Sequence, residues 1–190
     1  GKEFKLEWDE LISPDMLVFG SLMTQDVDSR VYQEIPSSKE MKEAIESYLE
    51  EYNETHPHAM HLSMFLDACG HVAKICRVLE QPNGNCLLLG VGGSGRQSLS
   101  RLATHIEEFE LYQIEVVKGY GMAEFREDLK QCLMKCGVDN KIEVFLFCDT
   151  QIVNEQFVEC VNNILNSGDV PNLYKTEDLD AITTVGRGLC

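Results

Sequence analysis

Along much of the chain, apolar residues recur every three or four positions, which is the spacing of one buried face of a helix. The first such stretch follows Ser37 and Glu40, whose spacing forms a capping box that begins a helix. Further helices are expected over 58–80, 99–106, 122–136 and 154–166, and Gly168 suits the C-terminal end of the last one. The apolar stripe of the first helix consists of Met41, Ala44, Ile45, Tyr48, Leu49 and Tyr52.

Shorter apolar runs predict strands over 85–89, 111–117 and 142–150. The run 85–89 is apolar on both sides, which is typical of a buried parallel strand. Because these runs alternate with helices, we expect a parallel sheet with right-handed crossovers, and therefore an α/β fold. Residues 1–36 show no such pattern and are expected to be irregular.

A glycine-rich turn joins the run 85–89 to the next helix. Gly90 and Gly95 match the glycines of the phosphate-loop pattern G-x-x-x-x-G-K-[ST], but Arg96 replaces its lysine and Gln97 its hydroxyl residue. A turn of this kind presents backbone N–H groups and a helix N-terminus to phosphate. The predicted phosphate-binding residues are Gly90, Val91, Gly92, Gly93, Ser94, Gly95, Arg96, Gln97 and Ser98.

The altered residues predict a loop that binds ATP or ADP but binds magnesium weakly or not at all. Arg96 keeps a positive charge in a bulkier, directional fork. Gln97 lacks the hydroxyl that ligates magnesium, and Ser98 lies about 100° further around the helix. Contacts to a diphosphate are mostly made by the backbone and should suffer less.

A second site element is expected where the apolar strand over 142–150 ends. Asp149 stands where an acidic residue would hold magnesium, directly or through water. In this class of site a glutamate that polarises the attacking water normally follows, and here the residue is Thr150. Because loss of a general base removes about 10²–10⁴ in rate, we expect negligible hydrolysis and no catalytic residue.

The loop over 90–99 resembles that of the fourth AAA module of axonemal (ciliary) dynein heavy chains, in which the changes to arginine and glutamine are themselves characteristic. The resemblance covers about residues 15–180 and is carried by further segments at 17–20, 28–32, 120–129, 149–152 and 166–173. It implies a P-loop NTPase fold, namely an AAA-type large subdomain with a partial parallel sheet flanked by helices and preceded by a helical segment. In that family a sensor strand lies between the loop strand and the Asp149 strand, and it is expected to be missing here.

The resemblance also suggests boundaries and an adenine contact. It divides the chain into an N-terminal arm (1–36), a helical lead-in (37–80), an incomplete P-loop AAA core (81–180) and a tail (181–190) without an assigned function. In AAA proteins an apolar segment before the first core helix contacts the adenine, which puts Leu17, Val18 and Phe19 near that position. Alternatively, Phe19 and Tyr32 only tether the arm to the core.

By the same resemblance, the parent protein is a microtubule motor of the cilium axoneme, in the cytoplasm and cytoskeleton. Its partners would be the neighbouring AAA modules of the same heavy chain, microtubules, and dynein intermediate and light chains. This module would regulate the motor without hydrolysing its nucleotide. Two alternatives remain open at this point: a structural relic that binds no nucleotide, and an active P-loop ATPase of another family.

Composition limits the other possibilities. The formal net charge of −16 argues against a nucleic-acid partner, and no apolar run is long enough to indicate a membrane span or a secretory signal. His56, His58 and His61 form an H-x-H-x-x-H cluster, which we interpret as an exposed entry into the next helix rather than a metal site. Cysteines inside apolar segments are expected to be small buried hydrophobes: Cys69, Cys76, Cys86, Cys132, Cys136, Cys148 and Cys160.

Overall fold

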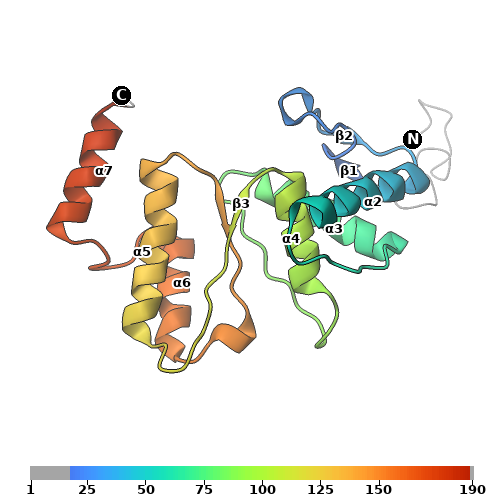
Figure 1. The fold of residues 1–190 in the computed structure, drawn as a ribbon. Helices are drawn as coiled ribbons and strands as arrows, with labels where there is room; N and C mark the ends of the chain where they lie inside the picture. Colours follow the sequence, from blue (N-terminus) through green and yellow to red (C-terminus); the bar gives the residue numbers. More distant parts are fainter. Residues whose placement is uncertain (1–17, 189–190) are drawn as a thin grey trace, which may run out of the picture. The chain divides into compact units, whose positions relative to one another are not determined.

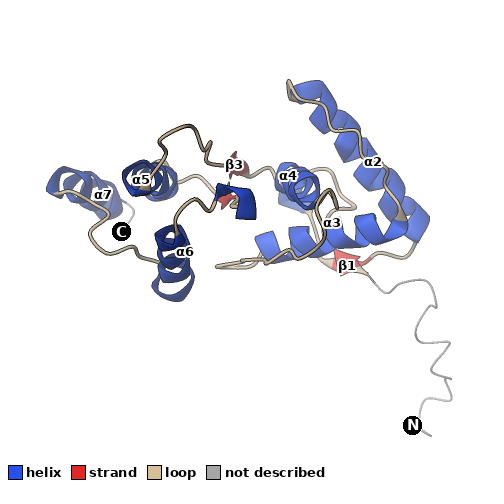
Figure 2. Ribbon diagram, turned by 90° about the horizontal axis from the view of Figure 1, so that it is seen from below, coloured by secondary structure: helices blue, strands red, loops and turns tan. Residues whose placement is uncertain are grey.

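The computed structural model describes residues 18–188 of the 190-residue chain (Figure 1). Two compact units make up the chain, and the division between them falls after Glu108. This division lies inside the segment 81–180 that was predicted as one core. Helices predominate in both units, and each unit contains a single two-stranded sheet among its described residues (Figure 2).

The described part of the first unit begins with a short antiparallel pair, in a stretch that was expected to be irregular. β1 (Phe19–Gly20) pairs with β2 (Gln33–Glu34), with the 3-10 helix η1 (Val27–Ser29) between them. Three helices follow: α2 (Ser38–Thr55), α3 (Leu66–Leu79) and α4 (Arg96–Ile106). The expected cap of α2 is confirmed, because the Ser37 hydroxyl accepts a hydrogen bond from the Glu40 N–H at 3.3 Å.

α3 is shorter than the predicted helix over 58–80, which is wrong for its first eight residues. The loop before α3 is fixed by the Asn53 side chain, which accepts a hydrogen bond from the Met60 N–H at 2.6 Å and donates one to the Met60 carbonyl at 3.1 Å. These bonds replace the helical ones that Met60 would otherwise make. Met64 is nevertheless buried, so the apolar spacing that suggested a helix reflects burial of an extended segment.

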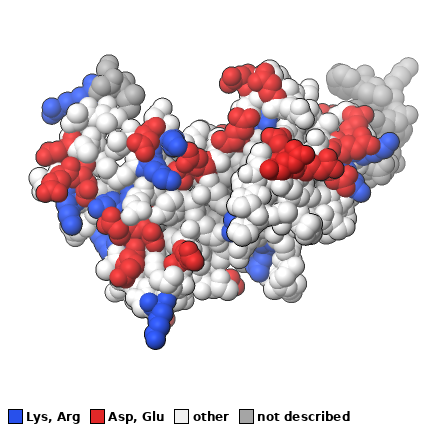
Figure 3. All heavy atoms as spheres, in the orientation of Figure 1, with Lys and Arg blue, Asp and Glu red and all other residues white. Residues whose placement is uncertain are grey.

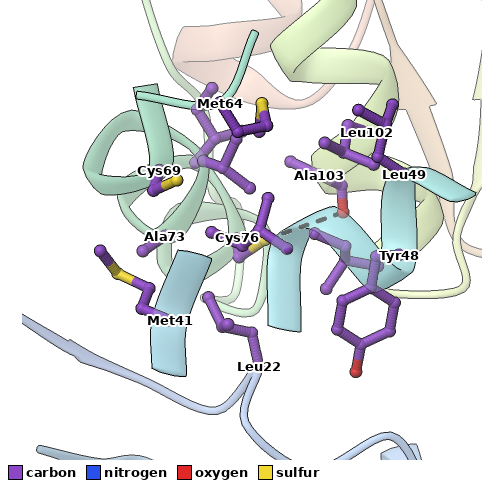
Figure 4. Close-up of a cluster of buried hydrophobic side chains, with 14 of the residues drawn as sticks. Leu22, Met41, Tyr48, Leu49, Met64, Cys69, Ala73, Cys76, Leu102 and Ala103 are labelled. Carbon is purple, nitrogen blue, oxygen red and sulfur yellow. Dashed lines mark hydrogen bonds between the residues drawn. The ribbon is translucent and has the colours of Figure 1, made fainter. Parts of the chain in front are cut away.

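The core of the first unit lies among α2, α3 and α4 (Figure 4). The predicted stripe of α2 is confirmed, since all its residues except the half-buried Ala44 are buried. Cys76 of α3 lies beside α4, and its thiol is 3.9 Å from the Ala103 carbonyl oxygen. The buried side chains of this core include Leu22, Met41, Ile45, Tyr48, Val72, Leu102 and Ile106.

A buried ion pair joins the N-terminal arm to the end of α4. The side chains of Arg30 and Glu107 are only 5% and 3% exposed, and they lie 3.2 Å apart. Arg30 also donates hydrogen bonds to the Thr24 carbonyl at 2.9 Å and to the Tyr48 hydroxyl at 3.1 Å. The guanidinium therefore connects the arm, α2 and α4 by a single side chain.

The predicted strand over 85–89 is not formed, and this expectation is wrong. Leu87 and Leu89 are each 83% exposed, and the segment joins no sheet among residues 18–188. Leu88 alone packs against the core of the first unit. The physical reason is that an extended segment becomes a strand only when a neighbour supplies hydrogen bonds to its backbone.

The second unit is built on a parallel pair of strands. β3 (Glu110–Tyr112) pairs with β4 (Glu143–Phe145), with Tyr112 opposite Phe145. The parallel pairing is as predicted, although both strands are shorter than the apolar runs that suggested them. Helix α5 (Met122–Val138) connects them, and η2 (Asp149–Gln151) and α6 (Glu155–Ser167) follow β4. α6 ends at Gly168, whose φ of 72° confirms the expected C-terminal cap.

An aromatic core fills the second unit. The rings of Phe125 and Phe157 are fully buried and stacked, with centroids 4.1 Å apart. Phe147 packs against Phe125 at 5.7 Å. A final helix that the apolar pattern did not indicate, α7 (Thr176–Gly188), packs on α5, where Lys130 and Asp178 form an ion pair at 3.6 Å. Within the described part of the chain, no helix is long and apolar enough to span a membrane.

Candidate functional site

The glycine-rich loop of the first unit is an exposed turn that leads into α4. The Ser94 N–H donates to the Val91 carbonyl at 3.3 Å, which closes the turn. Gly93 and Gly95 have φ angles of 77° and 75°, in the left-handed region that side chains with a Cβ disfavour. At Gly90 the constraint is space, because an added Cβ would lie 3.0 Å from the Ser94 hydroxyl.

Several N–H groups at the start of α4 have no capping side chain. Gly95 is the N-cap and therefore has no side chain to offer, and the first turn contains no acidic residue. The first helical hydrogen bond runs from the Leu99 N–H to the Gly95 carbonyl at 2.8 Å. A helix N-terminus that lacks a capping side chain, together with the positive end of the helix dipole, favours an anion at this position.

Arg96 lies back across the loop. Its guanidinium donates to the carbonyl oxygens of Leu88 at 3.5 Å and Val91 at 3.4 Å. Both distances are at the long end for hydrogen bonds, so releasing them costs little. Gln97 is exposed and Ser98 is half-buried, and the position of Gln97 offers no hydroxyl to a metal.

The predicted adenine segment borders the same core as the loop. Val18 packs against the core of the first unit, as Leu88 does, and its carbonyl accepts a hydrogen bond from the Ile35 N–H at 2.8 Å. Phe19 is 38% exposed and stacks on Tyr32, with ring centroids 6.2 Å apart. Leu17, the third residue of the predicted contact, lies outside the described residues.

Asp149 of the second unit begins the turn η2 and is exposed. Its carboxylate accepts a hydrogen bond from the Thr150 N–H at 3.0 Å, and Thr150 is also exposed. No group of three or more histidine, cysteine or acidic side chains that could hold a metal is found among residues 18–188. A single carboxylate suits magnesium only when phosphate and water supply the other ligands.

Gln151 positions this turn, and the sequence reasoning did not single it out. The residue is buried, and its side chain accepts a hydrogen bond from the Cys148 N–H at 2.7 Å and donates one to the Ile114 carbonyl at 2.6 Å. The two bonds hold the end of the strand segment against the segment after β3. The only signal in the sequence was its place in the segment 149–152 that carries the family resemblance.

The described cysteines differ in burial, and the clustered histidines are exposed. Cys69, Cys76, Cys132 and Cys160 are buried as expected, and burial raises the pKa of the Cys132 thiol to about 12. Cys136 and Cys148 are only half-buried. The expectation is wrong for Cys86, which is exposed because the segment that carries it is not in a sheet. The histidines at 56, 58 and 61 are exposed as expected, but they do not form the entry of a helix, because α3 begins only at Leu66.

Comparisons with known proteins identify the family of the chain. Residues 60–189 match the family described as the P-loop containing dynein motor region D4. The chain is 45% identical over 186 residues to dynein axonemal heavy chain 1 of Mus musculus, covering 98% of this chain and 4% of that protein. It is 47% identical over 176 residues to the dynein-1-beta heavy chain of the flagellar inner arm I1 complex of Chlamydomonas reinhardtii, covering 92% and 4%.

The chain thus spans about 4% of the length of the curated relatives that it matches. The family match covers most of the chain and includes both the glycine-rich loop and the Asp149 turn. On this evidence the chain belongs to the dynein heavy chain family and corresponds to part of its D4 motor region.

Proposed function

We propose that this region holds ATP or ADP without hydrolysing it and thereby regulates the microtubule motor of which it is a part. The observation that supports the proposal best is the uncapped start of α4, which follows a turn with Gly93 and Gly95 in left-handed conformations. Backbone groups make most of the contacts to a diphosphate in such loops, so the two altered side chains leave that function intact.

Two substitutions argue against turnover. Thr150 stands where catalysis would need a carboxylate, and an exposed hydroxyl cannot serve as the general base. Gln97 provides no hydroxyl for magnesium, which leaves Asp149 as the acidic group proposed to meet the ion. Val18 and Phe19 are proposed to contact the adenine.

The proposal for the parent protein rests on its relatives. Their names describe axonemal heavy chains and a flagellar inner arm complex, so we assign the parent to the cytoskeleton of the axoneme. Its proposed partners are neighbouring AAA modules of the same chain, microtubules, and dynein intermediate and light chains. Membership of the dynein family also argues against the alternative of an ATPase from another family.

A binding experiment with the parent motor tests nucleotide holding. Saturation with ADP at 100 times its dissociation constant should add about 2.7 kcal/mol to the stability of a protein that binds it. We expect the thermal shift to persist when every other nucleotide site is disabled and to disappear in Gly95→Ala. The same protein should release no phosphate above background from ATP, and steady release would contradict the proposal.

A relic that binds nothing is the second candidate, and the position of Arg96 favours it. The guanidinium donates hydrogen bonds to the carbonyl oxygens of Leu88 and Val91 rather than extending away from the loop. Arg96→Ala separates the two candidates. If Arg96 leaves the carbonyls to contact phosphate, the substitution should weaken ADP binding. If Arg96 only holds together a loop that binds no nucleotide, ADP should fail to bind to the wild type and to the variant alike.

A further inference from the structure

A groove along the second half of α2 lies apart from the glycine-rich loop. It is an open hollow of about 520 Å³ between α2 and the segment 60–63. Three apolar side chains line it, namely those of the buried Leu49 and of Met60 and Leu62. The rest of the lining is polar and consists of Glu46, Glu50, Asn53, His61 and Ser63. Figure 3 shows acidic side chains gathered over the surface of α2.

The shape of the groove is fixed in advance. Asn53 of α2 holds Met60 by the reciprocal pair of hydrogen bonds at 2.6 and 3.1 Å. The segment 60–63, which forms one wall of the groove, is therefore attached to α2, which forms the other. Met60 and Leu62 also pack against the core of the first unit, which limits their freedom. A partner would therefore lose little free energy in ordering this surface.

The charges of the groove are poorly compensated. Glu46 and Glu50 are four residues apart on one helix face, where like charges repel each other. Glu46 has a partner in Lys42, at 3.6 Å, but both side chains are 46% exposed and the pair is weak. Among residues 18–188, no cation lies within ion-pair distance of Glu50.

We propose that this groove binds a basic amphipathic segment of a partner polypeptide, with lysine or arginine against Glu46 and Glu50 and an apolar side chain on Leu62. Charge complementarity favours this occupant, because the net charge of −16 attracts basic partners and repels acidic ones. An enclosed small-molecule site does not fit, since the hollow is open. A metal site does not fit either, because the described residues form no ligand cluster.

The test uses the whole 190-residue chain and a labelled synthetic peptide, (Leu-Lys-Lys-Leu)₃, with (Leu-Glu-Glu-Leu)₃ as its acidic counterpart. Fluorescence anisotropy measures the dissociation constant at low and high salt. We expect the basic peptide to bind, the acidic one not to bind, and Glu46→Gln/Glu50→Gln to weaken binding by about tenfold. Asn53→Ala, which leaves the charge unchanged, should weaken it several-fold because the wall is released.

The matched control is Glu43→Gln/Glu54→Gln, which removes the same charge from positions of α2 outside the groove. It should change the dissociation constant by less than about twofold, with unchanged helicity by circular dichroism. Equal weakening by both double variants would mean general charge attraction and would overturn the proposal. Absence of peptide binding, or self-association of the chain that Glu46→Gln/Glu50→Gln abolishes, would overturn it as well.

Discussion

Two apolar segments lead to the two halves of the predicted site, and the structure treats them differently. The segment 85–89 precedes the glycine-rich loop, has no strand partner in the described chain, and leaves Leu87 and Leu89 exposed. The segment that precedes Asp149 begins as β4, pairs with β3 and packs Phe147 on an aromatic core. Because both segments have a similar sequence pattern, hydrophobicity alone does not make a strand; a backbone partner is also required.

The largest difference should appear between the aromatic core on which the Asp149 segment packs and the exposed segment 85–89, when an apolar side chain of each is truncated. Phe157→Ala removes a fully buried ring stacked on Phe125 and should cost about 3–5 kcal/mol. Leu89→Ala, at an 83% exposed position, should change stability by less than about 0.5 kcal/mol. Urea unfolding measures both values. A cost of several kcal/mol for Leu89→Ala would mean that the segment 85–89 is buried in solution.

The anchoring of the Asp149 turn gives the next largest effect. Gln151→Ala leaves the Cys148 N–H and the Ile114 carbonyl without their partner, and should destabilise the chain by about 1–3 kcal/mol. The exposed Gln131→Ala on α5 is the control and should be nearly neutral. Equal unfolding midpoints for the two variants would contradict the role given to Gln151.

A smaller effect is expected at the loop itself. Gly95→Ala forces a Cβ into a backbone with a φ of 75° and should cost about 1–2 kcal/mol. Gly137→Ala within α5 is the matched control, since that glycine has no positive φ and no atom within 4 Å of an added Cβ. It should stabilise the chain by about 0.4–1 kcal/mol. Thermal unfolding should therefore shift in opposite directions, and shifts of the same sign would refute the strain assigned to Gly95.

The smallest effect is a pH dependence in the first unit. Burial lowers the pKa of His105, an effect to which His56 adds, while Glu51 and Glu108 act to raise it. The unfolded chain then takes up this proton at a higher pH than the folded chain, so stability falls as the pH drops below about 6.5. His105→Gln should flatten this part of the urea midpoint curve, and an unchanged curve would contradict the role given to His105.

Helices with a strong apolar stripe could be predicted from the sequence. The stripe and cap of α2, the core face of α4 and the end of α6 at Gly168 all follow from local patterns. The start of α3 could not be predicted, because the Asn53 hydrogen bonds that replace its first turn join residues in different segments. Pairing of strands depends on such distant partners too, and so the unpaired state of 85–89 was missed.

The site shows the same limit. The turn at 90–98 was recognisable because glycines at fixed spacing determine the backbone there. The place of the Arg96 side chain on the loop carbonyls was not, since a long side chain has many rotamers and the sequence does not select one. Gln151 was missed for a related reason: its partners at 114 and 148 are brought together only by the fold.

α4 extends about 16 Å from the glycine-rich turn to Glu107, where Arg30 fastens it to the N-terminal arm. The helix acts as a spacer of set length between the turn and the anchor of the arm that carries Val18. A nucleotide that contacted both the turn and the arm would have to fit the distance that this helix sets between them. The arm and the turn would then have to move together. Loosening the Arg30 anchor would therefore change the fit of the base and the fit of the phosphates at the same time.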